Sequence, residues 1–145
     1  MNPTTAEKTL IWLLRLDGLI MSLALVAVFF PDVLMQWLHS RLGLGEMPVS
    51  PITEYLARSC SALYAMHGAV LLFVSLRVRD YWGLVRWILL LHIFLGLSLL
   101  GIDLAAAMPW YWTAVEGLPI AALGTFMLWL WKRADRAGVT GDQGT

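Results

Sequence analysis

Four ionisable residues interrupt long apolar runs near one end of the predicted helices, where charged side chains are costly. They are Glu54, Arg58, Asp103 and Glu116. Helical spacing places Arg58 and Asp103 at matching depths of roughly 28 to 31 Å, so the two side chains can meet. One arginine among three carboxylates could bind a polar head group or hold a carboxylate for proton transfer. The alternatives are a structural ion pair with interfacial acids around it and, for Glu116, a helix-starting capping box with Thr113.

Two histidines lie near the middle of neighbouring apolar runs. His67 and His92 are both roughly 15 Å deep, at the bilayer midplane, so two imidazoles of antiparallel helices could ligate one b-type haem iron. His92, Gly96 and Asp103 share a helical face, and the space beside Gly96 suits either a planar cofactor or a neighbouring helix. His67 falls roughly 120° from the small-residue stripe Ala57, Ser61, Ala65 and Gly68 of its helix. This phase favours interhelical hydrogen bonding over haem.

A third polar pair is predicted toward the opposite end of the helices. Asp17 lies roughly 13 Å from that end and is expected to pair with Arg86, while Arg15, at about 10 Å, can extend its guanidinium to the interface. Cys60 is the only cysteine, which excludes an internal disulfide, a CxxC redox pair and a thiolate zinc cluster. No metal site and no catalytic residue are assigned, because the sequence contains no phosphate loop, HExxH or serine-nucleophile motif.

The elements that position these residues belong in a membrane. The chain has 145 residues, of which 59% are hydrophobic and 14% charged, and its mean hydropathy of +0.71 is too high for a soluble domain. Ten basic and ten acidic residues cancel, so no overall field favours nucleic acid, and nucleic-acid binding is excluded.

Four apolar runs are long enough to span a bilayer. They cover residues 9–30, 55–76, 82–102 and 109–131. The first contains two charges and no following small-residue cleavage site, so we expect a retained span and not a signal peptide. Ser50-Pro51 marks the start of the second helix and Asp80 is the expected N-cap of the third.

The connecting segments carry further signals. Residues 32–42 are too few to span and have one polar side, which predicts a short interfacial helix that stops at Gly43; a loop helix of an ordinary bundle is the alternative. A Thr4-x-x-Glu7 capping box is expected to start the first helix. Residues 138–145 lack an apolar pattern and are expected to form a disordered cytoplasmic tail.

Basic residues and tryptophans agree on an orientation. Most bases near the membrane fall on one side if four helices alternate, which places both termini in the cytoplasm and the chain in the cell inner membrane. These bases are Lys8, Arg77, Arg79, Arg86, Lys132, Arg133 and Arg136. The eight tryptophans form two belts with none at the midplane, as four spans require.

The sequence thus predicts an all-α integral membrane protein, an up-down bundle of four transmembrane helices in a single domain over residues 1–137. In size and number of spans it resembles small bacterial four-helix membrane families such as the DoxX-like proteins. That resemblance rests on no shared motif, so it assigns no functional residue.

The favoured function is a non-enzymatic protein with an outward-facing polar cluster that binds a small molecule or lipid, or serves as a subunit of a membrane complex. A membrane enzyme with outer carboxylates as acid or base is the first alternative, and a haem b protein is the second. The lipid bilayer is the expected partner of the four spans. A small-residue surface on the fourth helix also predicts a homo-oligomer or a larger membrane complex. Its members are Gly117, Ala121, Gly124 and Thr125.

Overall fold

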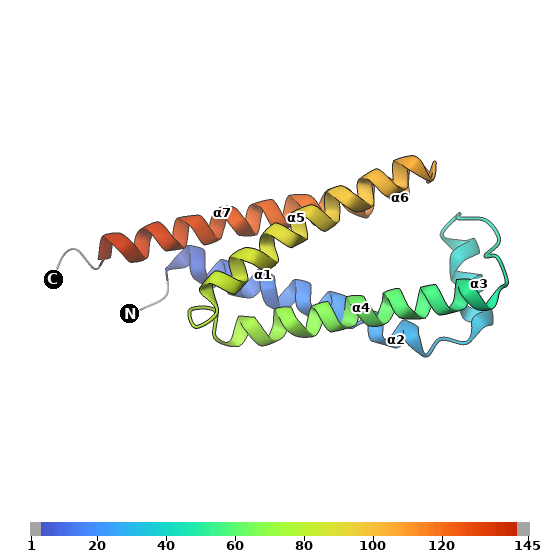
Figure 1. The fold of residues 1–145 in the computed structure, drawn as a ribbon, viewed down its shortest axis with the longest axis horizontal. Helices are drawn as coiled ribbons and strands as arrows, with labels where there is room; N and C mark the ends of the chain where they lie inside the picture. Colours follow the sequence, from blue (N-terminus) through green and yellow to red (C-terminus); the bar gives the residue numbers. More distant parts are fainter. Residues whose placement is uncertain (1–3, 142–145) are drawn as a thin grey trace. The chain divides into compact units, whose positions relative to one another are not determined.

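The computed structural model describes residues 4–141, with side chains to residue 137, and all regular structure in this part of the chain is helical (Figure 1). Four stretches are long and apolar enough to cross a membrane, Thr5–Val28, Pro51–Leu76, Trp82–Ala105 and Trp110–Ala137. The predicted fold class is confirmed, and the chain is a multi-pass membrane protein. Its helices are α1 (Thr5–Ser22), α2 (Ala24–Val28), α3 (Asp32–Arg41), α4 (Pro51–Leu76), α5 (Trp82–Ala105), α6 (Trp110–Val115) and α7 (Gly117–Gly141).

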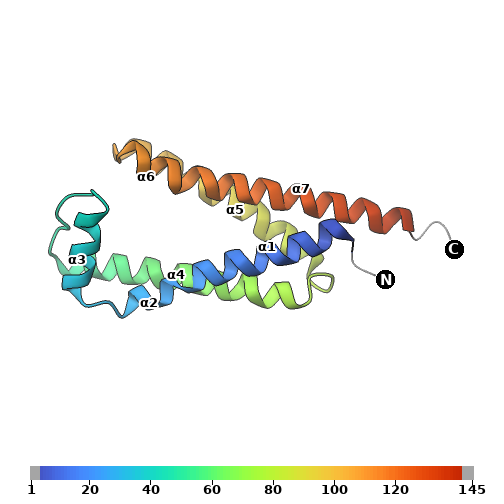
Figure 2. The same cartoon turned by 180° about the vertical axis from the view of Figure 1, so that it is seen from behind.

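The chain divides into two compact units. The first hairpin is residues 14–73 and contains the second half of α1 and most of α4, with α2 and α3 between them. The second hairpin is built on α5, α6 and α7 and also includes residues 4–13 and the α4–α5 turn. Figure 2 shows the same helices from behind. Which membrane the protein occupies, and which way its termini face, stay predictions.

In the first hairpin, α1 and α4 touch through two glycines. A Cβ atom on Gly68 would lie 2.6 Å from the carbonyl oxygen of Gly18 and 2.7 Å from Oγ of Ser22, so only glycine fits. The Ser22 hydroxyl donates a hydrogen bond to the Gly18 carbonyl at 2.7 Å. Small residues let helix backbones approach closely where lipid provides no hydrophobic drive for association. Gly68 of the predicted small-residue stripe therefore forms a helix–helix contact.

The first span is present as predicted, but it consists of two helical segments. α1 ends at Ser22 and α2 begins at Ala24. Between them the N–H of Leu23 is shared by the carbonyls of Leu19 and Ile20, both at 3.2 Å, a tightening toward 3₁₀ geometry that interrupts the α-helical ladder.

The short helix after the first span is present as predicted, over Asp32–Arg41. Gly43 adopts φ 74° and Leu44 N–H donates to the His39 carbonyl at 3.2 Å, a Schellman stop as expected of this glycine. The placement of α3 at a membrane interface stays a prediction.

The second hairpin is formed by α5 packed against α7. A Cβ on Gly96 would lie 2.7 Å from the carbonyl oxygen of Gly117 and closer still to the amide nitrogen of Ala121, and Gly124 packs on Ile93. Gly117, Ala121 and Gly124 are buried while Thr125 is exposed. The predicted self-association surface is therefore corrected, because most of it is internal packing against α5. A homo-oligomer stays a prediction.

The fourth span is also broken, at Glu116. α6 ends at Val115, Glu116 has φ −97° and ψ −83°, and α7 starts at Gly117. The predicted capping box from Thr113 to Glu116 is wrong, since Glu116 lies at the break and not inside a helix's first turn. Pro119 explains the break: its ring would collide with the carbonyl of Val115 in a continuous helix, whereas proline is tolerated in the first turn of a new one.

The remaining helix ends agree with the sequence predictions at one position and differ at others. The Thr4 hydroxyl accepts the Glu7 N–H at 3.2 Å, as the first capping box predicts. α5 starts at Trp82 after Tyr81 with no side-chain cap, so Asp80 is not its N-cap, which corrects that prediction. α7 continues to Gly141, into the predicted tail, and residues 142–145 lie outside the described residues.

The second hairpin anchors the start of α1 to the α4–α5 turn. Arg79 donates from Nε to Oε1 of Glu7 at 2.7 Å and from Nη2 to Oε2 at 2.8 Å, a bidentate ion pair. The hydrogen bonds and charge of the Glu7 carboxylate raise the pKa of the Arg79 guanidinium above its ordinary value. Nearby, Trp82 stacks on Trp131 with ring centroids 5.2 Å apart. These contacts fix the turn end of the hairpin.

Candidate functional site

Two carboxyl groups come together at the α5–α6 end of the second hairpin. Asp103 belongs to the last turn of α5 and is 5% exposed. Its Oδ2 atom is buried and has no hydrogen-bond partner. Glu116 is half-buried at the α6–α7 break, and its charge interacts with that of Asp103. The structure therefore brings two of the four predicted cluster residues to the same end of one hairpin, where their charges interact.

The sequence positions both carboxyls through local packing. Asp103 lies on the helical face that includes Gly96, and Gly96 is where α7 meets α5. The Pro119 break ends α6 so that Glu116 lies at a bend. The Glu116 carboxylate accepts a hydrogen bond from Nε1 of Trp112, one helical turn earlier. This bond fixes Glu116 while one oxygen of Asp103 is left without a donor.

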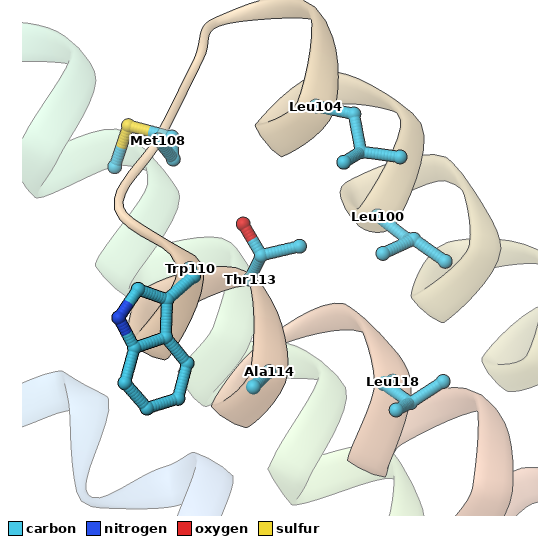
Figure 3. A pocket seen from close by; sticks show the side chains of 7 residues that line it. All are labelled: Leu100, Leu104, Met108, Trp110, Thr113, Ala114 and Leu118. Atoms are coloured by element: carbon cyan, nitrogen blue, oxygen red, sulfur yellow. The ribbon is translucent and has the colours of Figure 1, made fainter.

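An open apolar pocket of about 330 Å³ lies at the same end of the hairpin (Figure 3). Its walls come from the end of α5, the connecting loop and the α6–α7 segment, and Asp103 and Glu116 are not among the residues that line it. Thr113 contributes the only hydroxyl group. The lining residues are Leu100, Leu104, Met108, Trp110, Thr113, Ala114 and Leu118.

The other two cluster residues belong to the first hairpin, where Arg58 has a partner that the sequence analysis missed. Its Nη2 donates to Oδ1 of Asp32 at 2.7 Å, and its Nη1 donates to the Val28 carbonyl oxygen at 2.5 Å. Glu54 lies in the first turn of α4. An association of Glu54 and Arg58 with Asp103 and Glu116 stays a prediction.

The histidines occupy different hairpins. His92, in the second, is 1% exposed, and the adjacent space at Gly96 is filled by the backbone of α7. Of the two predicted uses of that space, a neighbouring helix is the one found. His67, in the first hairpin, interacts electrostatically with the buried carboxylate of Asp17. Ligation of one haem by both histidines stays a prediction.

Two further predictions concern Arg86 and metal ions. The Arg86 guanidinium lies over the Trp131 ring at 5.7 Å from its centroid, within the second hairpin. The predicted Asp17–Arg86 pair stays a prediction. Among the residues with described positions, no three histidine, cysteine, aspartate or glutamate side chains gather in a way that could hold a metal ion.

Comparison with protein-family models, with curated proteins and with solved structures found no match. The chemistry of the site follows from its own residues. Asp103 and Glu116 provide negative charge, one buried acceptor atom has no donor, and apolar and aromatic groups surround that end of the hairpin. Such a combination suits a ligand with a positively charged nitrogen and an apolar body.

Proposed function

We propose that this protein is a non-enzymatic membrane protein that binds an amphipathic amine at the α5–α6 end of the second hairpin. The observation that carries the proposal is the buried Oδ2 of Asp103, which has no hydrogen-bond partner and belongs to a carboxyl whose charge interacts with that of Glu116. An unsatisfied buried acceptor costs about 1–3 kcal/mol in a protein. A bound N–H donor would remove that cost.

The charge of the ligand follows from the carboxyl pair. Neither Asp103 nor Glu116 forms an ion pair with a described cation of its own hairpin. Two carboxylates in a low-dielectric environment repel each other, and a cation between them offsets both charges. A primary ammonium provides three N–H donors and a full positive charge. It can therefore donate a hydrogen bond to the unsatisfied oxygen and also offset the negative charge of the two carboxylates.

The apolar part of the ligand follows from the pocket at the same end of the hairpin. Its lining is leucine, methionine, alanine and tryptophan with one threonine. Binding sites for small molecules combine such apolar walls with a few polar groups that fix orientation. An alkyl chain in the pocket and an ammonium group at Asp103 form the arrangement that uses both features.

The test is binding of dodecylammonium to the full chain purified in dodecyl maltoside, measured by isothermal titration calorimetry. Dodecanol, which has the same chain without the charge, is the matched ligand control. We expect wild-type protein to prefer dodecylammonium by about tenfold or more. Asp103→Asn should remove that preference, and Glu116→Gln should reduce it.

A variant with the same chemical change elsewhere controls for total charge. Asp80→Asn removes an exposed carboxylate from the α4–α5 turn and should leave the preference unchanged. Equal binding of the amine and the alcohol by wild-type protein would contradict the proposal. Chemical conversion of the amine would instead support the enzyme alternative.

A further inference from the structure

A second charged surface lies at the opposite end of the second hairpin, on α7. One pocket of about 310 Å³ is lined by Trp129, Lys132, Arg133 and Arg136. The spacing i, i+3, i+4, i+7 places these four side chains along one face of the helix. All four are exposed, whereas Met127, Leu130 and Ala134 of the same helix are buried. The pocket therefore belongs to the outward face of α7.

The only acidic residue near these cations in α7 points elsewhere. Asp135 lies about 120° around the helix from the middle of the basic face. Its Oδ1 accepts a hydrogen bond from Nε1 of Trp82 at 2.9 Å, on α5. Asp135 is thus held at the α5–α7 contact and does not neutralise Lys132 and Arg133. The face keeps a local positive charge although the whole chain has none in excess.

The basic face continues into an aromatic one along the apolar span. Phe126 stacks on Trp129 with centroids 5.8 Å apart, and the Arg133 guanidinium lies 5.3 Å from the centroid of the Trp129 ring. Phe126 and Trp129 are about half exposed. Along α7, Phe126 thus comes first on the apolar span, Trp129 follows at the expected interface, and the three cations come last.

We infer that this face of α7, formed by Phe126, Trp129, Lys132, Arg133 and Arg136, binds an anionic phospholipid. Its phosphate lies among the three cations, and its acyl chains lie along Phe126 and Trp129. Arginine and lysine complement phosphate, and tryptophan prefers the level of lipid head groups. A free phosphate ion would use the cations but not the aromatic continuation, which is why the lipid is favoured. This site is independent of the amine site proposed above.

The test is lipid retention by native mass spectrometry of the full chain in micelles with equal amounts of dioleoyl phosphatidylglycerol and dioleoyl phosphatidylcholine. The two lipids have the same acyl chains and differ in head-group charge. Each interfacial cation strengthens binding of an anionic surface by about fivefold. The triple variant Lys132→Gln, Arg133→Gln, Arg136→Gln should therefore lower the preference for phosphatidylglycerol by on the order of 100-fold.

A matched variant removes the same total charge from other exposed positions: Lys8→Gln, Arg15→Gln and Arg41→Gln. It should retain the wild-type preference. Trp129→Ala should weaken lipid retention without changing the weak binding of glycerol 3-phosphate, which separates lipid from free phosphate. Equal retention of both lipids by wild-type protein, or an equal loss in the two triple variants, would overturn the inference.

Discussion

In the first hairpin the backbone of α1 meets that of α4 at Gly18 and Gly68, and in the second the backbone of α5 meets that of α7 at Gly96 and Gly117. The polar groups at the hairpin ends differ. Arg58 of the first hairpin is bonded to Asp32 and to a helix-end carbonyl. Asp103 of the second is more deeply buried and keeps an acceptor without a donor.

This difference separates a structural use of charge from a ligand-binding one. A buried polar group that is satisfied within its own unit contributes to the fold, and replacing one partner is costly. A buried group that is left unsatisfied lowers stability, and such exceptions are expected where function requires them. The comparison therefore predicts opposite effects of mutation at the two hairpin ends.

The largest expected effect tests the feature that the hairpins share. Gly96→Ala introduces a Cβ atom against the backbone of Gly117 and Ala121, which cannot move aside as a flexible side chain can. We expect a loss of about 3 kcal/mol in the free energy of unfolding, measured by circular dichroism in mixed micelles of dodecyl maltoside and dodecyl sulfate. Gly68→Ala should cost a similar amount.

Gly101→Ala is the matched control in the same helix, because nothing lies within 4 Å of a Cβ at that position. It should be neutral or slightly stabilising, since alanine is the better helix former. If Gly96→Ala were as benign as Gly101→Ala, the close α5–α7 contact would be refuted.

The next effect tests the satisfied charge of the first hairpin. Arg58→Ala leaves Asp32 and the Val28 carbonyl without their donor, and we expect a loss of about 1.5 kcal/mol after allowance for partial exposure. Arg41→Ala, which removes a cation lying over the Trp37 ring, should cost less. A double-mutant cycle with Asp32→Asn should give a coupling of about 1 kcal/mol, and additive losses would mean that the two residues do not interact.

The third effect has the opposite sign. Asp103→Leu removes a buried carboxylate with an unsatisfied oxygen, so in the absence of ligand it should stabilise the protein by about 1 kcal/mol. The same unfolding measurement checks it, with Asp80→Leu in the exposed turn expected to stay within about 0.5 kcal/mol of wild type. A marked loss of stability in Asp103→Leu would assign Asp103 to the fold.

The fold was largely predictable because composition and periodicity depend on the whole chain. Four apolar runs of spanning length, the short helix after the first and its stop at Gly43 are all found. The break at Glu116 was also visible in the sequence, in Pro119, but the apolar pattern on both sides favoured one helix. The break at Leu23 has no proline or glycine beside it, so propensity alone gives no signal.

The candidate site was less predictable because helical depth does not determine lateral position. Depth predicts a cluster that contains Asp103 and Glu116, which stays a prediction although the two charges interact within the second hairpin. It did not find Asp32 as the partner of Arg58, because Asp32 belongs to a short helix whose direction depends on the preceding break and on tertiary contacts. The small residues of α7 were recognised, but which neighbour they contact could not be read from one helix alone.

The smallest expected effect decides between the two interpretations of Asp103. The matching depths of the two residues along their helices predict that Arg58 pairs with Asp103. In the structure, Arg58 instead forms an ion pair with Asp32 of its own hairpin. We expect the Asp103 carboxyl to serve a ligand and not Arg58. The change in the free energy of unfolding of the double variant should then equal the sum of the changes in Arg58→Ala and Asp103→Asn within about 0.3–0.5 kcal/mol. A coupling of about 1 kcal/mol or more would restore the ion pair and remove the basis for an amine site. Repeating the cycle with saturating dodecylammonium sharpens the result, because only a ligand-binding Asp103 makes the stabilisation by the amine depend on this carboxylate.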